Sequence, residues 1–342
     1  MNLKNLSVTT KIPKILSEKL KNKKILQIYK KFEKSLDIKK NFIVAVSGGP
    51  DSLALAFLAK IYAYRNKVKS KFCMVDHKLR NNSTSEAKLV KKILSKYSIS
   101  LDILTWRGKK PTKNIQSLAR KKRYELLFSF CKKYKIKDIL LGHHQDDQLE
   151  NFFIRILRGS GLKGLVSLDK KNIINSISLL RPLISLKKED LIFISNYVFN
   201  FYIKDPSNLD EKFRRVIIRK LIGDLKENGL ETKKFLKTID NLKHSDNAIT
   251  FYTKENLIKN TSFFPKKNQL ILNSNFFKQP YEIIFRTLSN AIQFIGKKYY
   301  PSRGKKLDKI IKDVKNNSLY KSTLGGCIVK KVNHSVIISK ER

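Results

Sequence analysis

A segment rich in glycine and serine, with one carboxylate, points most directly to chemistry. It reads Ser47-Gly48-Gly49-Pro50-Asp51-Ser52. Glycines let the backbone approach a phosphate closely, and the N–H groups at a helix start attract an anion. The segment lacks the Lys-Ser/Thr pair of a Walker loop. A carboxylate such as Asp51 fits among phosphates when a divalent cation bridges them. Alternatively, Asp51 caps the helix of an ordinary strand–turn–helix connection.

A second reactive segment is Gly142-His143-His144-Gln145-Asp146-Asp147-Gln148-Leu149-Glu150. Asp147 and Glu150 are three residues apart, so on a helix they share one face. Clustered carboxylates repel and raise one another's pKa unless a cation lies among them, which predicts a site for a cationic substrate. The alternative is a favourable interaction with the helix dipole alone. The two histidines predict a buried, hydrogen-bonded pair rather than a zinc site, since zinc needs further ligands.

Arginines form a third group of candidates. Arg120 and Arg123 share one face of a predicted helix, and we expect Arg123, together with Arg120, to contact a phosphate. The alternative is a solvated helix surface. Further candidates for contacts with nucleic-acid phosphates are Arg155, Arg158, Arg181, Arg214, Arg215 and Arg219.

The composition agrees with a polyanionic partner. The chain has 342 residues with 73 Lys+Arg against 28 Asp+Glu, a net charge of +45, which favours nucleic acid, although a biased coding composition would also enrich lysine. The cysteines Cys73, Cys131 and Cys327 have no paired spacing, which excludes a disulfide scaffold and argues against a cysteine-ligated cluster. No apolar run approaches the ~18 residues of a membrane span. A secretory signal needs an uninterrupted apolar region, and lysines interrupt Met1–Lys30, so we expect a cytoplasmic protein.

Four short apolar runs must position these residues: 42–46, 72–75, 101–106 and 138–141. They alternate with helical patterns at about 51–64, 85–97, 114–134 and 146–158. This alternation predicts a doubly wound α/β fold with a mainly parallel sheet. Ligands bind beyond the carboxyl ends of such strands, and polar clusters follow three of the runs at 47–52, 76–80 and 142–150. We therefore expect the clusters, including Asp76 and His77, to meet at one edge.

The remaining sequence predicts further segments. A fifth run at 177–184 contains Arg181-Pro182, which predicts an edge strand or a crossing segment. Turn residues mark breaks at Asp205-Pro206-Ser207-Asn208 and at 300–304. We expect four parts: a basic N-terminal helix (1–36), a nucleotide-binding catalytic domain (37–226), a mainly helical linker or nucleic-acid-binding domain (227–299) with a strand at 269–272, and a small α+β cap (300–342).

The motifs together resemble one family. Ser47–Ser52 is similar to the SGGxDS loop of the PP-loop ATP pyrophosphatases. Val75–Arg80, the Gln116–Tyr124 helix and Gly142–Glu150 resemble the tRNA(Ile)-lysidine synthetase family, as do Arg158–Leu165, Arg181–Leu183, Asp205–Asn208 and, more weakly, Thr323–Cys327. The chain departs from the family at Val216, where an asparagine usually follows Arg215.

The resemblance implies the adenine nucleotide alpha hydrolase-like PP-loop fold and a two-step reaction. ATP adenylates the C2 carbonyl oxygen of the wobble cytidine in a tRNA(Ile) with a CAU anticodon. The ε-amine of free L-lysine then displaces AMP, which changes the codon read from AUG to AUA. The implied ATP-binding residues are Ser47, Gly48, Gly49, Pro50, Asp51, Ser52, Asp76 and His77. Asp51 is implied to hold Mg²⁺, Arg123 to be catalytic, and Asp147 and Glu150 to bind lysine and act in catalysis.

Two alternatives stay open. A related tRNA thiolase would need paired cysteines, which this chain lacks. A non-catalytic, basic RNA-binding protein could have kept the fold without the reaction, although the intact loop and the Asp147/Glu150 pair argue against it. The sequence leaves the oligomeric state open, a homodimer included.

Overall fold

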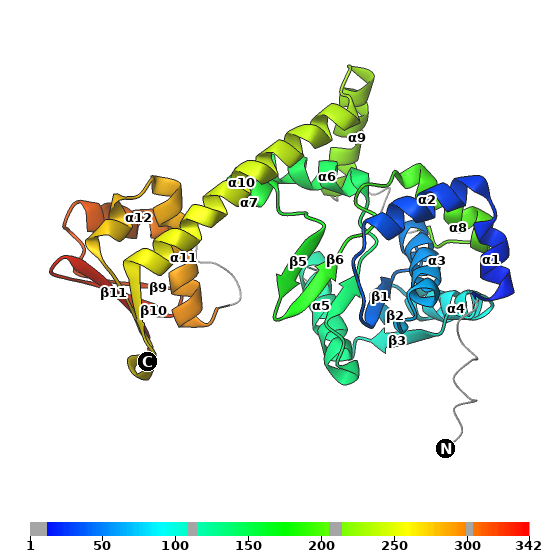
Figure 1. The fold of residues 1–342 in the computed structure, drawn as a ribbon, viewed down its shortest axis with the longest axis horizontal. Helices are drawn as coiled ribbons and strands as arrows, with labels where there is room; N and C mark the ends of the chain where they lie inside the picture. Colours follow the sequence, from blue (N-terminus) through cyan, green and yellow to red (C-terminus); the bar gives the residue numbers. More distant parts are fainter. Residues whose placement is uncertain (1–11, 109–114, 205–213, 299–303, 342) are drawn as a thin grey trace. The chain divides into compact units, whose positions relative to one another are not determined.

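The apolar run that precedes the glycine-rich loop forms the inner strand β1, Phe42–Val46. The computed structural model describes residues 12–108, 115–204, 214–298 and 304–341 (Figure 1). The chain divides into two units, Met1–Leu236 and Lys237–Arg342, and each is considered by itself.

The first unit is built on a six-stranded sheet with the order β3-β2-β1-β4-β6-β5. All neighbours pair in parallel except β5, which is antiparallel to β6. The other strands are β2 (Ser70–Asp76), β3 (Leu101–Thr105), β4 (Asp138–Leu140), β5 (Lys171–Ile174) and β6 (Ile177–Leu180). The predicted doubly wound, mainly parallel α/β fold is therefore confirmed.

Helices cover both faces of this sheet (Figure 1). The larger core buries side chains of five helices on one face: α1 (Lys14–Leu20), α2 (Lys23–Lys34), α3 (Pro50–Arg65), α4 (Ser83–Ser95) and α8 (Lys188–Phe199). A second core lies between the opposite face and α5 (Ile115–Tyr134). Apolar burial on both faces explains why the strand sequences are continuously apolar rather than alternating.

Two predictions about this unit were wrong. Residues 12–36 form two helices rather than one, because the side chain of Asn22 accepts the N–H groups of Lys24 and Ile25 and starts α2 anew. The run at 177–184 supplies an inner strand rather than an edge or crossing segment. Pro182 lies two residues beyond Leu180, the last residue of β6, so its missing N–H removes no bond from the sheet.

Three helices continue from the carboxyl edge of the sheet: α6 (Gln145–Ile156), α7 (Leu162–Leu165) and α9 (Arg214–Glu227). Leu149 of α6 packs with Ile218 and Ile222 of α9 in a small separate core. Phe235, in the first turns of α10 (Thr232–Asn260), stacks on Phe153 with ring centroids 5.2 Å apart. The packing fixes α9 beside α6.

The second unit has one five-stranded antiparallel sheet with the order β7-β8-β11-β10-β9. Its elements are β7 (Thr261–Phe264), the 3₁₀ turn η3 (Pro265–Lys267), β8 (Gln269–Leu272), η4 (Ser274–Lys278), α11 (Tyr281–Gly296), α12 (Gly304–Lys315), β9 (Lys321–Leu324), β10 (Cys327–Val332) and β11 (Ser335–Lys340). The expected strand at 269–272 is present as β8. The expected boundary near residue 299 does not separate two folds, because β8 pairs with β11 and both strands share one core.

Some expectations fall on residues that the structure does not describe. The turn at 205–208 and residues 300–303 of the second break lie outside the described ranges. Among the described helices, none combines the length and the apolar character that crossing a membrane requires.

Candidate active site

The glycine-rich segment forms a tight turn between β1 and α3. The N–H and the hydroxyl of Ser47 donate to Ser52 Oγ at 3.0 and 3.1 Å, and the Ser52 hydroxyl donates to the carbonyl of Gly49 at 2.9 Å. Pro50 is the first residue of α3, where its missing N–H costs nothing. The hydroxyl of Ser52 thus stabilises the turn through these three hydrogen bonds.

Gly48 is required by the conformation of this turn. Its φ is +83°, and a Cβ there would lie 2.5 Å from Ile203 Cδ1. The carbonyl of Gly48 also accepts the N–H of Ile203 at 2.9 Å. From α8, the fully buried Ser195 donates to the carbonyl of Pro50 at 2.6 Å. The chain at 195–203 therefore supports the loop from behind.

Gly142 brings the acidic segment up to the loop. A Cβ at Gly142 would lie 3.3 Å from the backbone nitrogen of Ser52 and 3.4 Å from the carbonyl group of Asp51. Such contacts are tighter than ordinary van der Waals packing, so a side chain here would push the end of β4 away from α3. The glycine is what allows the two polar segments to meet.

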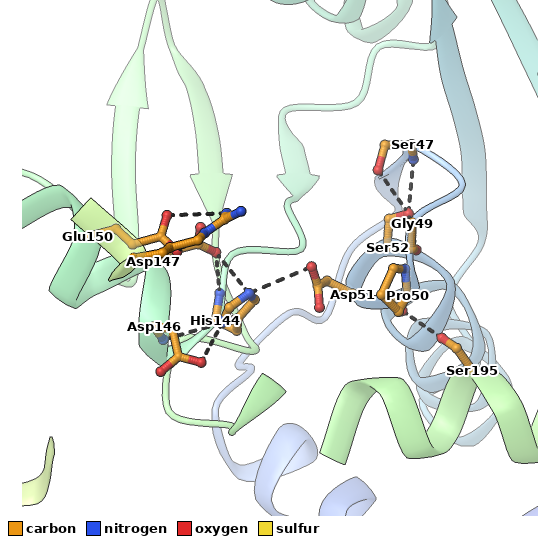
Figure 2. A network of polar contacts seen from close by, with 11 residues as sticks. Ser47, Gly49, Pro50, Asp51, Ser52, His144, Asp146, Asp147, Glu150 and Ser195 are labelled. Carbon is orange, nitrogen blue, oxygen red and sulfur yellow. Dashed lines mark hydrogen bonds and ion pairs between the residues drawn. The ribbon is translucent and has the colours of Figure 1, made fainter. Parts of the chain in front are cut away.

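His144 lies between the carboxylates of these two segments (Figure 2). Its Nε2 is 3.6 Å from Asp51 Oδ2 and 3.5 Å from Asp147 Oδ2. Its Nδ1 accepts the N–H of Asp146 at 3.3 Å, so Nε2 is the ring nitrogen that carries a proton toward both carboxylates. The backbone N–H of His144 donates to Asp147 Oδ2 at 2.9 Å, which completes a capping box at the start of α6.

The pKa values of Asp51 and Asp147 are shifted in opposite directions. Burial raises the pKa of Asp51, and His144 and Lys188 oppose this only in part. Burial would also raise the pKa of Asp147, but His144, His143 and the N–H of His144 bring it below its ordinary value. Asp147 is therefore held ionised, whereas Asp51 is a carboxylate whose charge is incompletely compensated.

Glu150 and Asp146 already have cationic partners in the protein. Arg219 of α9 donates to Glu150 through Nε at 2.6 Å and through Nη2 at 3.4 Å, and Glu150 is almost fully buried. Lys226 Nζ lies 3.8 Å from Asp146 Oδ1. Of the three clustered carboxylates, Asp147 lies near His144 Nε2, the nitrogen that also faces Asp51, whereas Asp146 Oδ2 lies 3.8 Å from Nδ1 on the other side of the ring.

The third polar cluster is at the end of β2. Buried Asp76 accepts the N–H of Lys78 at 3.0 Å and the hydroxyl of Thr84 at 2.6 Å. These bonds lower the pKa of Asp76 although burial opposes them. Beside it, Arg123 Nε donates to His77 Nε2 at 3.4 Å. Burial and the charge of Arg123 lower the pKa of His77 to about 4, so His77 is neutral at pH 7.

Comparisons with known proteins agree with this arrangement. Residues 17–225 match the family model of the PP-loop domain. The tRNA(Ile)-lysidine synthase of Wolbachia sp. subsp. Brugia malayi is 33% identical over 302 residues, which cover 87% of this chain and 70% of that protein. The enzyme of that name from Orientia tsutsugamushi is 35% identical over 308 residues, covering 87% and 69%. The chain belongs to the tRNA(Ile)-lysidine synthase family.

A solved structure supports the fold alone. The U34-tRNA thiolase NcsA from Methanococcus maripaludis matches with a TM-score of 0.56 and 18% identity, over 65% of this chain and 79% of that one. The match to the PP-loop model and the similarity to tRNA(Ile)-lysidine synthases confirm the predicted fold, the family and its classification as an ATP-using ligase. The relatives named above are longer than this chain, which spans about 70% of their length.

The cysteines do not form a reactive site. Cys73, Cys131 and Cys327 are each buried and free. Burial raises the pKa of Cys131 to about 12 and that of Cys327 to about 11, and it raises the pKa of Cys73 as well. Protonated, buried thiols are poor nucleophiles and poor ligands, so this family member lacks the cysteine chemistry of the thiolase alternative.

The predicted arginines have different environments. Arg120 contacts the Tyr124 ring, with its guanidinium carbon 5.3 Å from the centroid, and it is exposed, as are Arg158, Arg214 and Arg215. Arg155 is half-buried. Arg181 is only 6% exposed and donates to the carbonyl of Asp169 at 2.7 Å, so it holds the start of β5 rather than offering a surface cation. Arg219 is bound to Glu150.

Several contributors to the site escaped the sequence reasoning. Ser195 and Ile203 lie about 150 residues from the loop that they contact, and an ordinary serine or isoleucine gives no signal of such a role. The pairing of Arg219 with Glu150 was also missed, although each residue was a candidate for another contact. The helical spacing of Arg219 and Arg215 indicates that both can lie on one helix face, but it does not predict that Arg219 pairs with Glu150.

Proposed function

We propose that this protein adenylates the C2 carbonyl oxygen of the wobble cytidine in tRNA(Ile) with a CAU anticodon and joins free L-lysine to that carbon. The observation that supports the proposal most is the position of His144, with the Asp51 carboxylate of the phosphate loop on one side and Asp147 on the other, 3.6 and 3.5 Å away. A nucleobase held there would meet both the nucleotide and the amine. A cytoplasmic location remains our prediction.

In the first step, the cytidine O2 attacks the α-phosphorus of ATP, the α–β bridging bond breaks and pyrophosphate leaves. The amides at the start of α3 can bind an anion, and the contacts of Ser47 and Ser52 hold the turn that carries them. Arg123 and neutral His77 lie beside Asp76 at the neighbouring strand end, where we place the adenosine.

Asp51 is suited to a magnesium ion. Its Oδ1 is buried and has no hydrogen-bond partner among the described residues. Across those same residues no group of three His, Cys, Asp or Glu is arranged to hold a metal, and Mg²⁺ commonly takes one or two carboxylates together with substrate phosphates. When bound, the ion would neutralise charge on the phosphates.

In the second step, the neutral ε-amine attacks C2, the C2–O bond breaks and AMP leaves. Asp147, held ionised, attracts the lysine ammonium to the site. Because Arg219 neutralises Glu150, we assign Glu150 to the wall of the lysine site, where it orients Arg219. His144 Nε2 faces both Asp51 and Asp147, and its interaction with each carboxylate lowers that carboxylate's pKa.

The test is a reaction with unmodified tRNA(Ile), ATP and labelled lysine. We expect lysine incorporation with one AMP and one pyrophosphate released per lysidine. Incorporation that requires a sulfur donor instead of lysine would favour a thiolase. Binding of tRNA with no pyrophosphate release would favour a non-catalytic RNA-binding protein.

A further inference from the structure

A cavity of the second unit lies between helix α12 and the strand β9. Its volume is about 380 Å³, within the range of about 300–1,000 Å³ for pockets that hold small ligands. It lies wholly within one unit, and no residue of the candidate active site lines it. Its polar lining includes Lys306, Lys309, Tyr320, Lys321, Ser322 and Thr323.

The charge of the lining favours an anion. Lys306 and Lys309 are three residues apart on α12 and share a face, and Lys321 begins the opposite wall on β9. All three side chains belong to exposed residues. Asp313 is the one carboxylate in the lining, so the cavity has three ammonium groups against a single negative charge. A phosphate group would offset part of this excess.

Tyr320 provides an aromatic surface at the rim. The residue is 75% exposed, although its neighbour Leu319 is buried in the core of the unit. The carbonyl of Tyr320 accepts the N–H of Lys331 at 3.3 Å, which fixes the backbone in place. Lys330 Nζ lies 5.6 Å from the ring centroid. An aromatic ring with most of its area exposed can stack on a base.

The strand at this wall supplies hydrogen-bonding groups. Among the strands of the described residues, β9 is the last of its sheet and pairs with β10 alone, so none of those strands lies along its outer edge. Ser322 and Thr323 lie on β9 and line the cavity. Their hydroxyls can donate to or accept from a ribose hydroxyl or a base edge.

We propose that this cavity binds an unpaired nucleotide of RNA, with the base stacked on Tyr320 and the phosphate held by Lys306, Lys309 and Lys321. Lysines alone would also suit an acidic peptide. The exposed ring and the hydroxyls beside it favour a nucleotide, which presents a base, a ribose and a phosphate together. The proposal rests on the proposed function in one respect, which is that tRNA(Ile) is taken as the RNA.

The first experiment measures the affinity of the full chain for unmodified tRNA(Ile) without ATP or lysine. Tyr320→Ala should weaken binding about 5- to 150-fold, the range for loss of one stacked base. Tyr320→Phe keeps the ring and should restore most of the affinity. Tyr252→Ala is the matched control, since Tyr252 is 60% exposed in the same unit but does not line the cavity.

The second experiment measures how this affinity depends on salt. The double variant Lys306→Gln/Lys309→Gln should reduce the slope of log K against log salt by about 1.4 to 1.8, the loss expected for two phosphate contacts. Lys266→Gln/Lys267→Gln removes the same charge from η3, outside the cavity, and should change the slope less.

Equal affinities for Tyr320→Ala and its control, or equal slopes for the two double variants, would overturn the proposal. The proposal would also be overturned if a polyglutamate peptide displaced tRNA from the protein and Tyr320→Ala left the affinity for tRNA unchanged. Because binding is measured without ATP or lysine, a failure to form lysidine would refute the proposed function and leave this result standing.

Discussion

At the residue scale, the site depends on a buried histidine between two carboxylates with opposite pKa shifts. The capping box fixes which nitrogen of His144 faces Asp51 and Asp147. The sequence predicted that a cation must lie among the acidic residues. The structure shows that the protein itself supplies part of that charge, through Arg219 at Glu150 and Lys226 at Asp146. Such pairings depend on side-chain positions that sequence spacing does not contain.

The Glu150–Arg219 pair gives a prediction about lysine binding. Glu150→Gln weakens the charge-assisted hydrogen bond that orients Arg219 at the wall of the lysine site. Because such a bond is worth about 1.5–3 kcal/mol, the KM for lysine should rise about 10- to 100-fold and the KM for ATP should change far less. Steady-state kinetics with Glu227→Gln, an exposed change on α9, as the control would check it. Equal increases in both KM values would remove Glu150 from the lysine site.

His77 gives a prediction about pH. Its pKa is about 4 in the folded protein against 6.5 ordinarily, so between these values the unfolded chain binds more protons and stability falls as the pH falls. His77→Gln should therefore lose less unfolding free energy than the parent between pH 7 and 4.5. Denaturant titrations at both pH values would measure this, with the exposed His244→Gln as the control. Identical pH profiles for His77→Gln and the parent would contradict the assignment.

At the element scale, the sequence predicted the strands that are marked by continuous apolar runs. Four of the five parallel strands, β1 to β4, and the helices after them were predicted with small errors at their ends, because burial on both faces leaves an unbroken apolar signal. β5 was missed because Lys171–Ile174 is short, partly exposed and half polar. α8 was missed because its apolar residues show no clear helical stripe, and this helix supports the phosphate loop.

The support by α8 is testable at Ser195. Ser195→Ala removes the hydrogen bond to the carbonyl of Pro50 and should lower stability by about 0.5–1.5 kcal/mol. Because this bond holds the start of α3, the KM for ATP should rise more than the KM for lysine. Ser129→Ala, on the exposed surface of α5, is the control. An unchanged KM for ATP in a destabilised Ser195→Ala protein would mean that the bond serves the fold alone.

At the scale of the whole molecule, the chain has a net charge of +45 and divides into two units. Each unit has its own buried core. The sequence indicated basic segments and a late α+β fold. It did not show that strands on both sides of residue 299 form one sheet, because long-range strand pairing leaves no local pattern.

Removing the second unit should separate tRNA binding from ATP binding. A chain ending at Leu236 keeps Phe235, whose ring stacks on Phe153, and should bind ATP with nearly the affinity of the full chain. Its affinity for tRNA(Ile) should fall about tenfold or more, because cationic groups that neutralise phosphates are lost. Calorimetry for ATP and filter binding for tRNA would measure both. An unchanged tRNA affinity would assign recognition to the first unit alone.

The central claim is that the phosphate loop and Asp147 serve consecutive steps on one nucleobase. The most direct measurement follows pyrophosphate release and lysine incorporation separately, with unmodified tRNA(Ile), in two variants. Asp51→Asn should lose both signals, and Asp147→Asn should still release pyrophosphate and accumulate adenylated tRNA without incorporating lysine. Normal lysine incorporation by Asp147→Asn, or undiminished pyrophosphate release by Asp51→Asn, would contradict the account.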